Sequence, residues 1–130
     1  MTIEQDLIQR TKLFSLRVIK LTDALPRTSV GRTIGNQLLR SGTSVGANYR
    51  AACRARSKAD FVSKLGIVEE EADECMYWLE LIIEASLIPE TRVQPLLREA
   101  NELLSITIAS RKTSAIRKSK IKNQKSPATQ

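Results

Sequence analysis

Residues 61–82 have the sequence FVSKLGIVEEEADECMYWLELI, in which apolar side chains recur at alternating steps of four and three residues. The residues that keep this spacing are Phe61, Leu65, Val68, Ala72, Cys75, Leu79 and Ile82. Heptad spacing places one continuous apolar edge along an α-helix and favours near-parallel packing against other helices. The stretch therefore predicts a core helix over about residues 57–86, with Ser57 as its N-terminal cap.

Three further helices are predicted, over about residues 3–23, residues 29–55, and from residues 89–94 to residue 110. Apolar side chains with helical spacing indicate each of them. The expected inward-facing residues are Ile3, Leu7, Phe14, Val18, Leu21 and Leu25 in the first, Val30, Ile34, Leu38, Val45, Asn48 and Ala52 in the second, and Leu96, Leu97, Ala100, Leu103, Leu104 and Ile108 in the last. Ser29 is the expected N-terminal cap of the second helix.

Short connections between four amphipathic helices predict an all-α fold, an up-down-up-down antiparallel four-helix bundle. With 130 residues the chain is long enough for one such domain, which we expect at residues 1–110. Residues 111–130 are rich in Lys, Arg and Ser and end in a Ser-Pro-Ala-Thr-Gln sequence. This composition predicts a basic, disordered C-terminal tail.

Charge is sorted along the chain by helix. Between Ala24 and Ala59 there are seven basic residues and no acid, whereas residues 60–90 contain nine acids and one lysine. The tail adds seven more basic residues without an acid, and the formal net charge is +7. Such sorting indicates a surface that is reserved for a polyanion.

Four arginines of the second helix, Arg32, Arg40, Arg50 and Arg54, are the main candidates for phosphate contacts. At about 100° of rotation per residue they share one stripe about 80° wide, opposite the core face. The stripe exists only if the helix is continuous through Gly42, which could break it. Guanidinium groups suit bidentate contacts with phosphate. Pairing with the acidic helix or with another subunit, and plain solvation, are the open alternatives.

The basic tail supplies further candidates for contact with a nucleic-acid backbone. These residues are Arg111, Lys112, Arg117, Lys118, Lys120 and Lys122. A cationic arm adds affinity through counterion release and does not read sequence. The alternative is a tail that serves solubility alone.

Glycines form a second edge of the predicted second helix, close to the arginine stripe. Gly31, Gly35, Gly42 and Gly46 project to within about 60° of one another on an ideal helix. Because glycine has no side chain, this edge would let another helix approach closely, within the subunit or in an oligomer. Local breaking of the helix around residues 41–44 is the alternative.

Catalytic and metal-binding functions find no support in the sequence. The chain has no histidine, which removes Ser/His and Cys/His nucleophiles and the usual zinc sites. The carboxylates of residues 70–74 lie on one outer helix face, which fits a solvated or ion-paired surface better than a catalytic pair. We therefore expect no catalytic residue, no metal and no cofactor.

The remaining features predict the compartment and an anchor residue. No apolar run approaches the roughly 20 residues that span a bilayer, and the N-terminus lacks the features of a signal peptide. We therefore expect a cytoplasmic protein with no membrane partner. Trp78 is expected to serve as a core or interface anchor rather than as a platform for base stacking.

Three motifs carry a resemblance to a known family. They are NQLLRSGTSVGANY at residues 36–49, SKADF at residues 57–61, and EADE at residues 71–74 followed by YWLE at residues 77–80. These motifs resemble the small four-helix-bundle proteins encoded in intervening sequences of bacterial 23S ribosomal RNA genes. The same family includes the accessory variability determinant of diversity-generating retroelements. The resemblance covers about residues 13–104.

The resemblance implies a ring-like homopentamer with a positively charged surface. Members of the accessory type bind nucleic acid and associate with a reverse transcriptase. Arg40, Asn48, Glu71 and Glu74 match the family motif, and we interpret them as structural or interfacial residues. Ala51 stands where the family commonly has a glutamate, which leaves the predicted second helix still more basic.

These observations favour a non-enzymatic, homo-oligomeric accessory protein that binds the backbone of RNA or DNA, and it could assist a reverse transcriptase in a retroelement. One alternative is a scaffold whose basic surface docks an acidic protein partner. Another is an intervening-sequence protein with no direct nucleic-acid role. The sequence leaves the choice between the ribosomal-gene and retroelement branches open.

Overall fold

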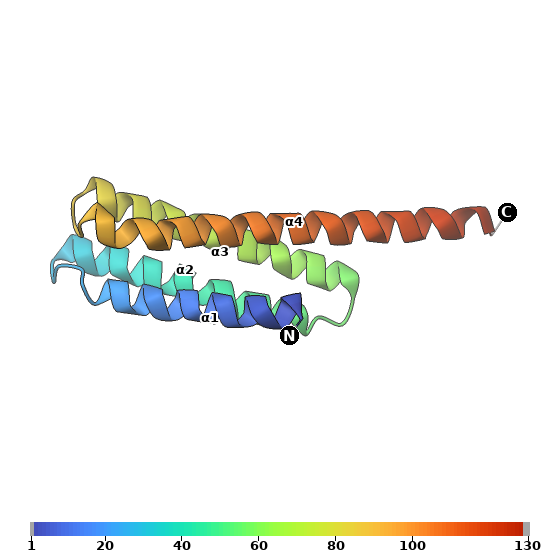
Figure 1. Ribbon diagram of the computed structural model, residues 1–130, viewed down its shortest axis with the longest axis horizontal. Coiled ribbons are helices and arrows are strands. Elements are labelled where there is room, and N and C mark those ends of the chain that lie inside the picture. Colours follow the sequence, from blue (N-terminus) through green and yellow to red (C-terminus); the bar gives the residue numbers. More distant parts are fainter. Residues whose placement is uncertain (1, 129–130) are drawn as a thin grey trace.

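The computed structural model describes residues 2–128, and it describes side chains for residues 2–116. This part of the chain contains four helices and no strand: α1 (Ile3–Thr22), α2 (Ser29–Cys53), α3 (Lys58–Glu84) and α4 (Glu90–Ala128). Successive helices run in opposite directions and pack side by side (Figure 1). The predicted antiparallel four-helix bundle is therefore confirmed.

Side chains at the helix starts explain where three of the helices begin. The Thr2 hydroxyl accepts from the Gln5 backbone N–H at 3.1 Å, and the Ser57 side chain caps α3 in the same way. The predicted cap at Ser29 is wrong. Thr28 caps α2 instead, because its extended backbone places Oγ1 3.1 Å from the N–H of Gly31.

The fourth helix extends farther than the sequence analysis predicted. It continues past Ser110 to Ala128, and its C-terminal part projects beyond the bundle (Figure 1). The predicted helix end near Ser110 is therefore wrong, whereas disorder of the basic tail stays a prediction. The physical reason is that no Gly or Pro interrupts the chain before Pro127, while Lys, Arg, Ala and Ile are compatible with a helix. A domain boundary at residue 110 stays a prediction.

The core follows the heptad edge of α3. Its six residues from Leu65 to Ile82 are buried, and Phe61 is partly buried at the end of the bundle. Two inward positions were predicted wrongly, since Ile3 is 75% exposed and Val30 is 55% exposed. Both lie in the first turn of a helix, where the neighbouring helices do not cover them. Asn48 is only partly buried.

The glycine edge of α2 receives α1 of the same chain. A Cβ atom at Gly42 would lie 2.7 Å from Val18 Cγ1, and one at Gly46 would lie 3.3 Å from the Thr11 carbonyl oxygen. At Gly31 the Pro26 carbonyl oxygen fills the space that a Cβ would occupy. Helix α2 is continuous through Gly42, so the local-breaking alternative is wrong. The missing side chains let α1 and the α1–α2 connection approach α2.

Candidate nucleic-acid interface

The four arginines predicted to form a stripe are all exposed on α2 or at its end, but their partners differ. Arg32 donates to the backbone carbonyl of Arg27 at 3.1 Å, and Arg54 is the C-terminal cap residue. Among the described side chains, Arg32, Arg50 and Arg54 form no ion pair. These three are therefore available to an external anion, whereas Arg40 is not.

Arg40 is bound by two carboxylates of α3. Its Nη1 lies 3.3 Å from Glu71 Oε2, and its Nη2 donates to Glu74. Trp78 Nε1 donates to the same Glu74 carboxylate at 3.2 Å. The hydrogen bond from Arg40 lowers the pKa of Glu74 and in turn raises the pKa of Arg40. At this position the pairing alternative is correct, and the network joins α2 to α3.

Two further arginines also form ion pairs with carboxylates of a neighbouring helix. Arg10 on α1 contacts Glu99 at 2.7 Å and Glu102 at 3.0 Å, and its hydrogen bond to Glu99 raises the pKa of the guanidinium. Arg111 on α4 donates to Glu69 on α3. Arg111 therefore closes a contact within the bundle, although the sequence analysis placed it among the phosphate contacts.

Of the other candidates in the tail, only Lys112 has a described side chain. Lys112 is exposed on α4. The structure does not describe the side chains of the remaining four candidates, which are Arg117, Lys118, Lys120 and Lys122. Their contribution to binding stays a prediction.

The remaining predicted packing residues make contacts within one subunit. Gly35 faces Leu25, whose Cδ1 would lie 3.1 Å from a Cβ at that position. Asn48 Nδ2 donates to the Ser44 carbonyl of its own helix at 2.8 Å. The Trp78 ring packs edge-on against Tyr77, with 5.1 Å between the ring centres. These residues stabilise α2 and α3, and a role between subunits stays a prediction.

A groove between α1 and α2 joins two cations that the sequence analysis did not connect. Its volume is about 230 Å³, and it is lined by Ile8, Lys12, Ser15, Thr43, Gly46, Ala47 and Arg50. Gly46 leaves the floor of the groove free of a side chain, and no acid lines it. Lys12 and Arg50 therefore border the same hollow from two different helices.

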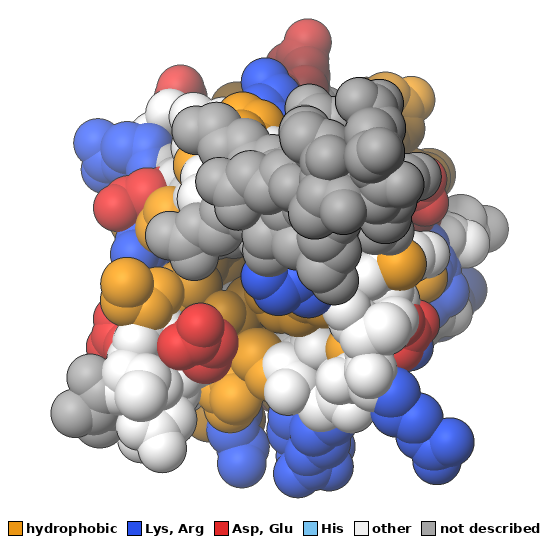
Figure 2. All heavy atoms as spheres, turned by 90° about the vertical axis from the view of Figure 1, so that its right-hand side faces the viewer, with side chains coloured by type: hydrophobic (Ala, Val, Ile, Leu, Met, Phe, Trp, Pro, Cys, Tyr) orange, Lys and Arg blue, Asp and Glu red, His pale blue; other side chains and the backbone are white. Residues whose placement is uncertain are grey.

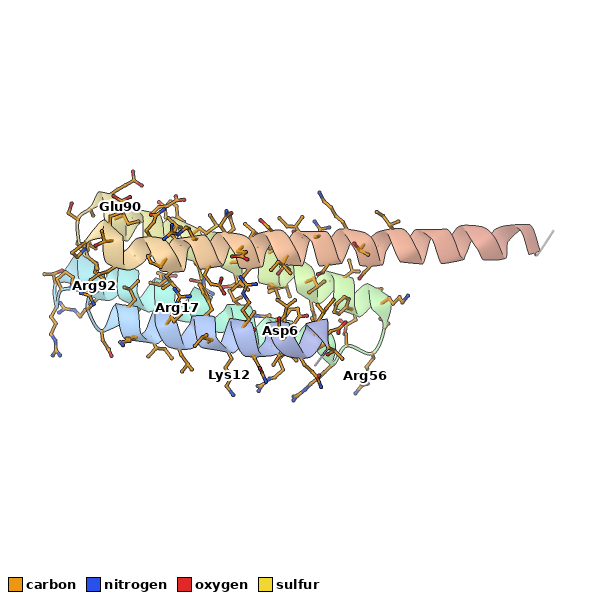
Figure 3. The ribbon with its side chains drawn as sticks, in the orientation of Figure 1. Asp6, Lys12, Arg17, Arg56, Glu90 and Arg92 are labelled. Atoms are coloured by element: carbon orange, nitrogen blue, oxygen red, sulfur yellow. The ribbon has the colours of Figure 1, made fainter. Side chains whose placement is uncertain are left out.

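The basic residues around this groove extend along one side of the molecule. Lys12 and Arg56 both point away from the bundle on the side opposite α4 (Figure 3). In the end view, Lys and Arg side chains project along the edge formed by α1 and α2 (Figure 2). Arg54 follows Arg50 by one helical turn, so it lies on the same face of α2. We call Lys12, Arg50, Arg54 and Arg56 the basic surface.

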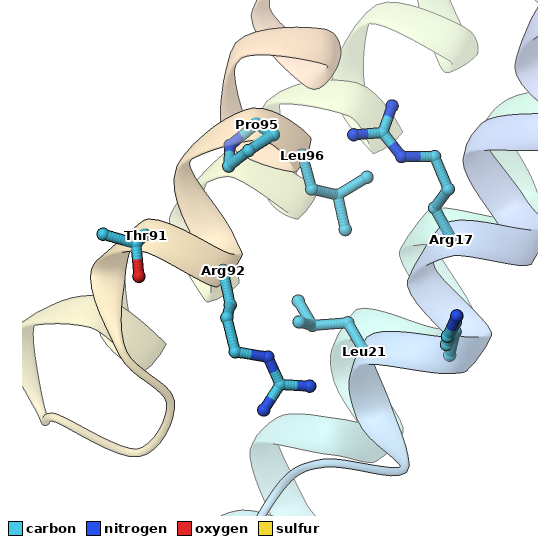
Figure 4. A pocket seen from close by; sticks show the side chains of 7 residues that line it. Arg17, Leu21, Thr91, Arg92, Pro95 and Leu96 are labelled. Carbon is cyan, nitrogen blue, oxygen red and sulfur yellow. The ribbon is translucent and has the colours of Figure 1, made fainter.

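A second, larger groove lies between α1 and α4. Its volume is about 520 Å³, and it is lined by Arg17, Lys20, Leu21, Thr91, Arg92, Pro95 and Leu96 (Figure 4). Three of these residues are cations and none is an acid. This groove has no signal in the sequence, because its cations belong to segments in which acids and bases balance overall.

Other kinds of site find no support in the described residues. No group of three or more Cys, Asp or Glu side chains among them is placed to hold a metal ion. Cys75 is fully buried against Ser41, and burial raises the pKa of its thiol to about 12. No helix in this part of the chain is long and apolar enough to span a membrane.

Comparisons with known proteins agree with this architecture. The profile of a family described as 23S rRNA-intervening sequence protein matches residues 4–109. A crystal structure of a protein of unknown function from the S23 ribosomal protein family of Bacteroides thetaiotaomicron is similar to the chain, with 33% sequence identity and a TM-score of 0.79. The match covers 85% of this chain and 99% of that protein. A comparison with curated proteins finds no match. The chain therefore belongs to the family of 23S rRNA-intervening sequence proteins.

Proposed function

We propose that this protein is a non-enzymatic, homo-oligomeric accessory protein that binds the backbone of nucleic acid through its basic surface. The observation that carries the proposal is the groove between α1 and α2, where Lys12 and Arg50 face one hollow without an acid. Two cations on opposite rims can contact successive phosphates of a strand that follows the groove. Arg54 continues the row along α2.

Binding of this kind depends on charge and not on base sequence. Cations that neutralise phosphates release the counterions condensed on the nucleic acid, so affinity falls as salt concentration rises. The basic surface presents Lys and Arg side chains but no described element that would enter a groove of a duplex to read base edges. The proposal therefore predicts similar affinities for strands of different sequence. Repetition of the surface in an oligomer would raise the affinity further.

A homopentamer and a reverse-transcriptase partner stay predictions that rest on the resemblance. The alternative of an acidic protein partner involves the same cations. An assay that compares an acidic peptide with an oligonucleotide therefore distinguishes the two hypotheses. If this protein binds a polyglutamate peptide but no oligonucleotide at low salt, the result supports the scaffold alternative and overturns our proposal.

The direct experiment is a fluorescence-anisotropy titration of the full chain with labelled oligouridylate and oligothymidylate of about 12 nucleotides. We expect Lys12→Gln and Arg50→Gln each to weaken binding by about fivefold, the loss expected for one exposed charged contact. Arg98→Gln is the matched control, because it removes an exposed cation from α4, away from the α1–α2 groove. Equal affinities for the wild type and both groove variants would overturn the proposal.

A further inference from the structure

The groove between α1 and α4 repeats the geometry of an ion pair but lacks the acid. Arg10 of α1 contacts Glu99 of α4 at 2.7 Å, and the two helices run antiparallel (Figure 1). Seven residues onward in α1 lies Arg17, and seven residues back in α4 lies Arg92. Because seven residues are about two helical turns, the register that pairs the first two residues also brings the second two to face each other. A guanidinium therefore stands where the repeat would place a carboxylate.

The two guanidinium groups lie at opposite ends of the same groove (Figure 4). Arg17 extends from α1 towards α4 and Arg92 extends from α4 towards α1, with Leu21 and Leu96 between them (Figure 4). Lys20 is the third cation of the groove. None of the three forms an ion pair with a described side chain. Three like charges around one groove without an acid make it electropositive, so an anion bound there would stabilise the arrangement.

From this juxtaposition we infer that the α1–α4 groove is a binding site for a nucleotide unit. The phosphate would bind the guanidinium group of Arg17 or of Arg92 at one end of the groove, because a guanidinium group binds phosphate oxygens in bidentate geometry. Its base would rest on the apolar floor of Leu21, Pro95 and Leu96. The groove volume of about 520 Å³ falls within the range of about 300–1,000 Å³ that small-ligand sites occupy.

Two sources of this ligand share the same chemistry. One is a free mononucleotide, which would make the groove a site independent of the basic surface. The other is one nucleotide of a bound strand, and this reading rests on the proposed function. In the second case a strand would contact the molecule on two sides of α1, at the α1–α2 groove and at the α1–α4 groove.

Isothermal titration calorimetry of the full chain with adenosine 5′-monophosphate, and separately with inorganic phosphate, tests the site. We expect the mononucleotide to bind more tightly than phosphate alone, because only the mononucleotide has a base for the apolar floor. Arg17→Gln or Arg92→Gln, whichever removes the phosphate contact, should lose at least about tenfold in affinity, as for removal of one charge-assisted contact. Arg98→Gln is again the control and should bind as the wild type does.

A second variant tests whether a loss of binding could be due to loss of the fold. Arg92→Glu should create an ion pair with Arg17, the counterpart of the Arg10–Glu99 pair, so it should fold and yet lose the mononucleotide. The same variants are then titrated with the labelled oligonucleotides. Loss of oligonucleotide binding alone assigns the site to a strand, and loss of mononucleotide binding alone assigns it to a free nucleotide.

The results separate this inference from the proposed function. If Arg17→Gln and Arg92→Gln bind both ligands as the wild type does, or if Arg98→Gln loses as much as they do, the inferred site is wrong. The proposed role of the basic surface would then be tested by Lys12→Gln and Arg50→Gln alone. If those two variants leave oligonucleotide binding unchanged while mononucleotide binding depends on Arg17 or Arg92, the proposed function is wrong. The inferred nucleotide site in the α1–α4 groove is then retained.

Discussion

Alanine at Gly42 adds one methyl group where α1 and α2 pack against each other. The new Cβ would lie 2.7 Å from Val18 Cγ1 and 2.8 Å from Val18 Cγ2. Val18 is fully buried, and its β-branched side chain has little freedom to rotate away. Overpacking of this kind costs about 1–3 kcal/mol. Alanine recovers about 1 kcal/mol of helix propensity, so we expect Gly42→Ala to lower the free energy of unfolding by up to about 2 kcal/mol.

Gly66 supplies the matched control, since it also lies inside a helix but a Cβ there would meet nothing within 4 Å. Gly66→Ala should therefore raise the free energy of unfolding by about 0.5–1 kcal/mol. Urea unfolding followed by far-ultraviolet circular dichroism measures both variants against the wild type. Close packing of α1 on the glycine edge is refuted if Gly42→Ala proves as stable as Gly66→Ala.

Three more predictions test the ion pairs and the core. The lowered pKa of Glu74 implies stability that is present above its unfolded value of about 4.3 and is lost as pH falls through the folded value. Arg40→Gln should therefore differ most from the wild type near neutral pH, and urea unfolding that shows a constant gap down to about pH 3 would contradict this. Arg92→Glu should raise stability by about 0.2–1 kcal/mol through a pair with Arg17, and a lower melting temperature would speak against the helix register. Cys75 should resist a thiol reagent until the protein unfolds, so the folded protein should titrate with one accessible thiol and not two.

The sequence predicted the parts of the fold that depend on one helix at a time. The spacing from Leu65 to Ile82 is a property of α3 alone, and it identified the buried edge of that helix correctly. The glycine edge of α2 likewise predicted a close approach, but it could not name α1 as the partner. The end of α4 was missed because the basic composition after Ser110 outweighed the absence of helix breakers.

Ion pairing depends on the register between helices, which no single helical pattern contains. On a helical wheel Arg40 and Arg50 look alike, yet only Arg40 meets the carboxylates of α3. Lys12 was missed for the same reason, because its proximity to Arg50 arises only when α1 packs on the glycines of α2. The spacing shared by Arg10 and Arg17 is visible in the sequence, but its meaning requires the pairing of α1 with α4.

The salt dependence of oligonucleotide binding tests the central claim most directly. For a single strand, each phosphate contact contributes about 0.7 to the slope of log affinity against log salt concentration. The double variant Lys12→Gln/Arg50→Gln removes two such contacts, so its slope should be about 1.4 smaller in magnitude than that of the wild type. A slope equal to that of the wild type would contradict the assignment of the basic surface as the nucleic-acid interface.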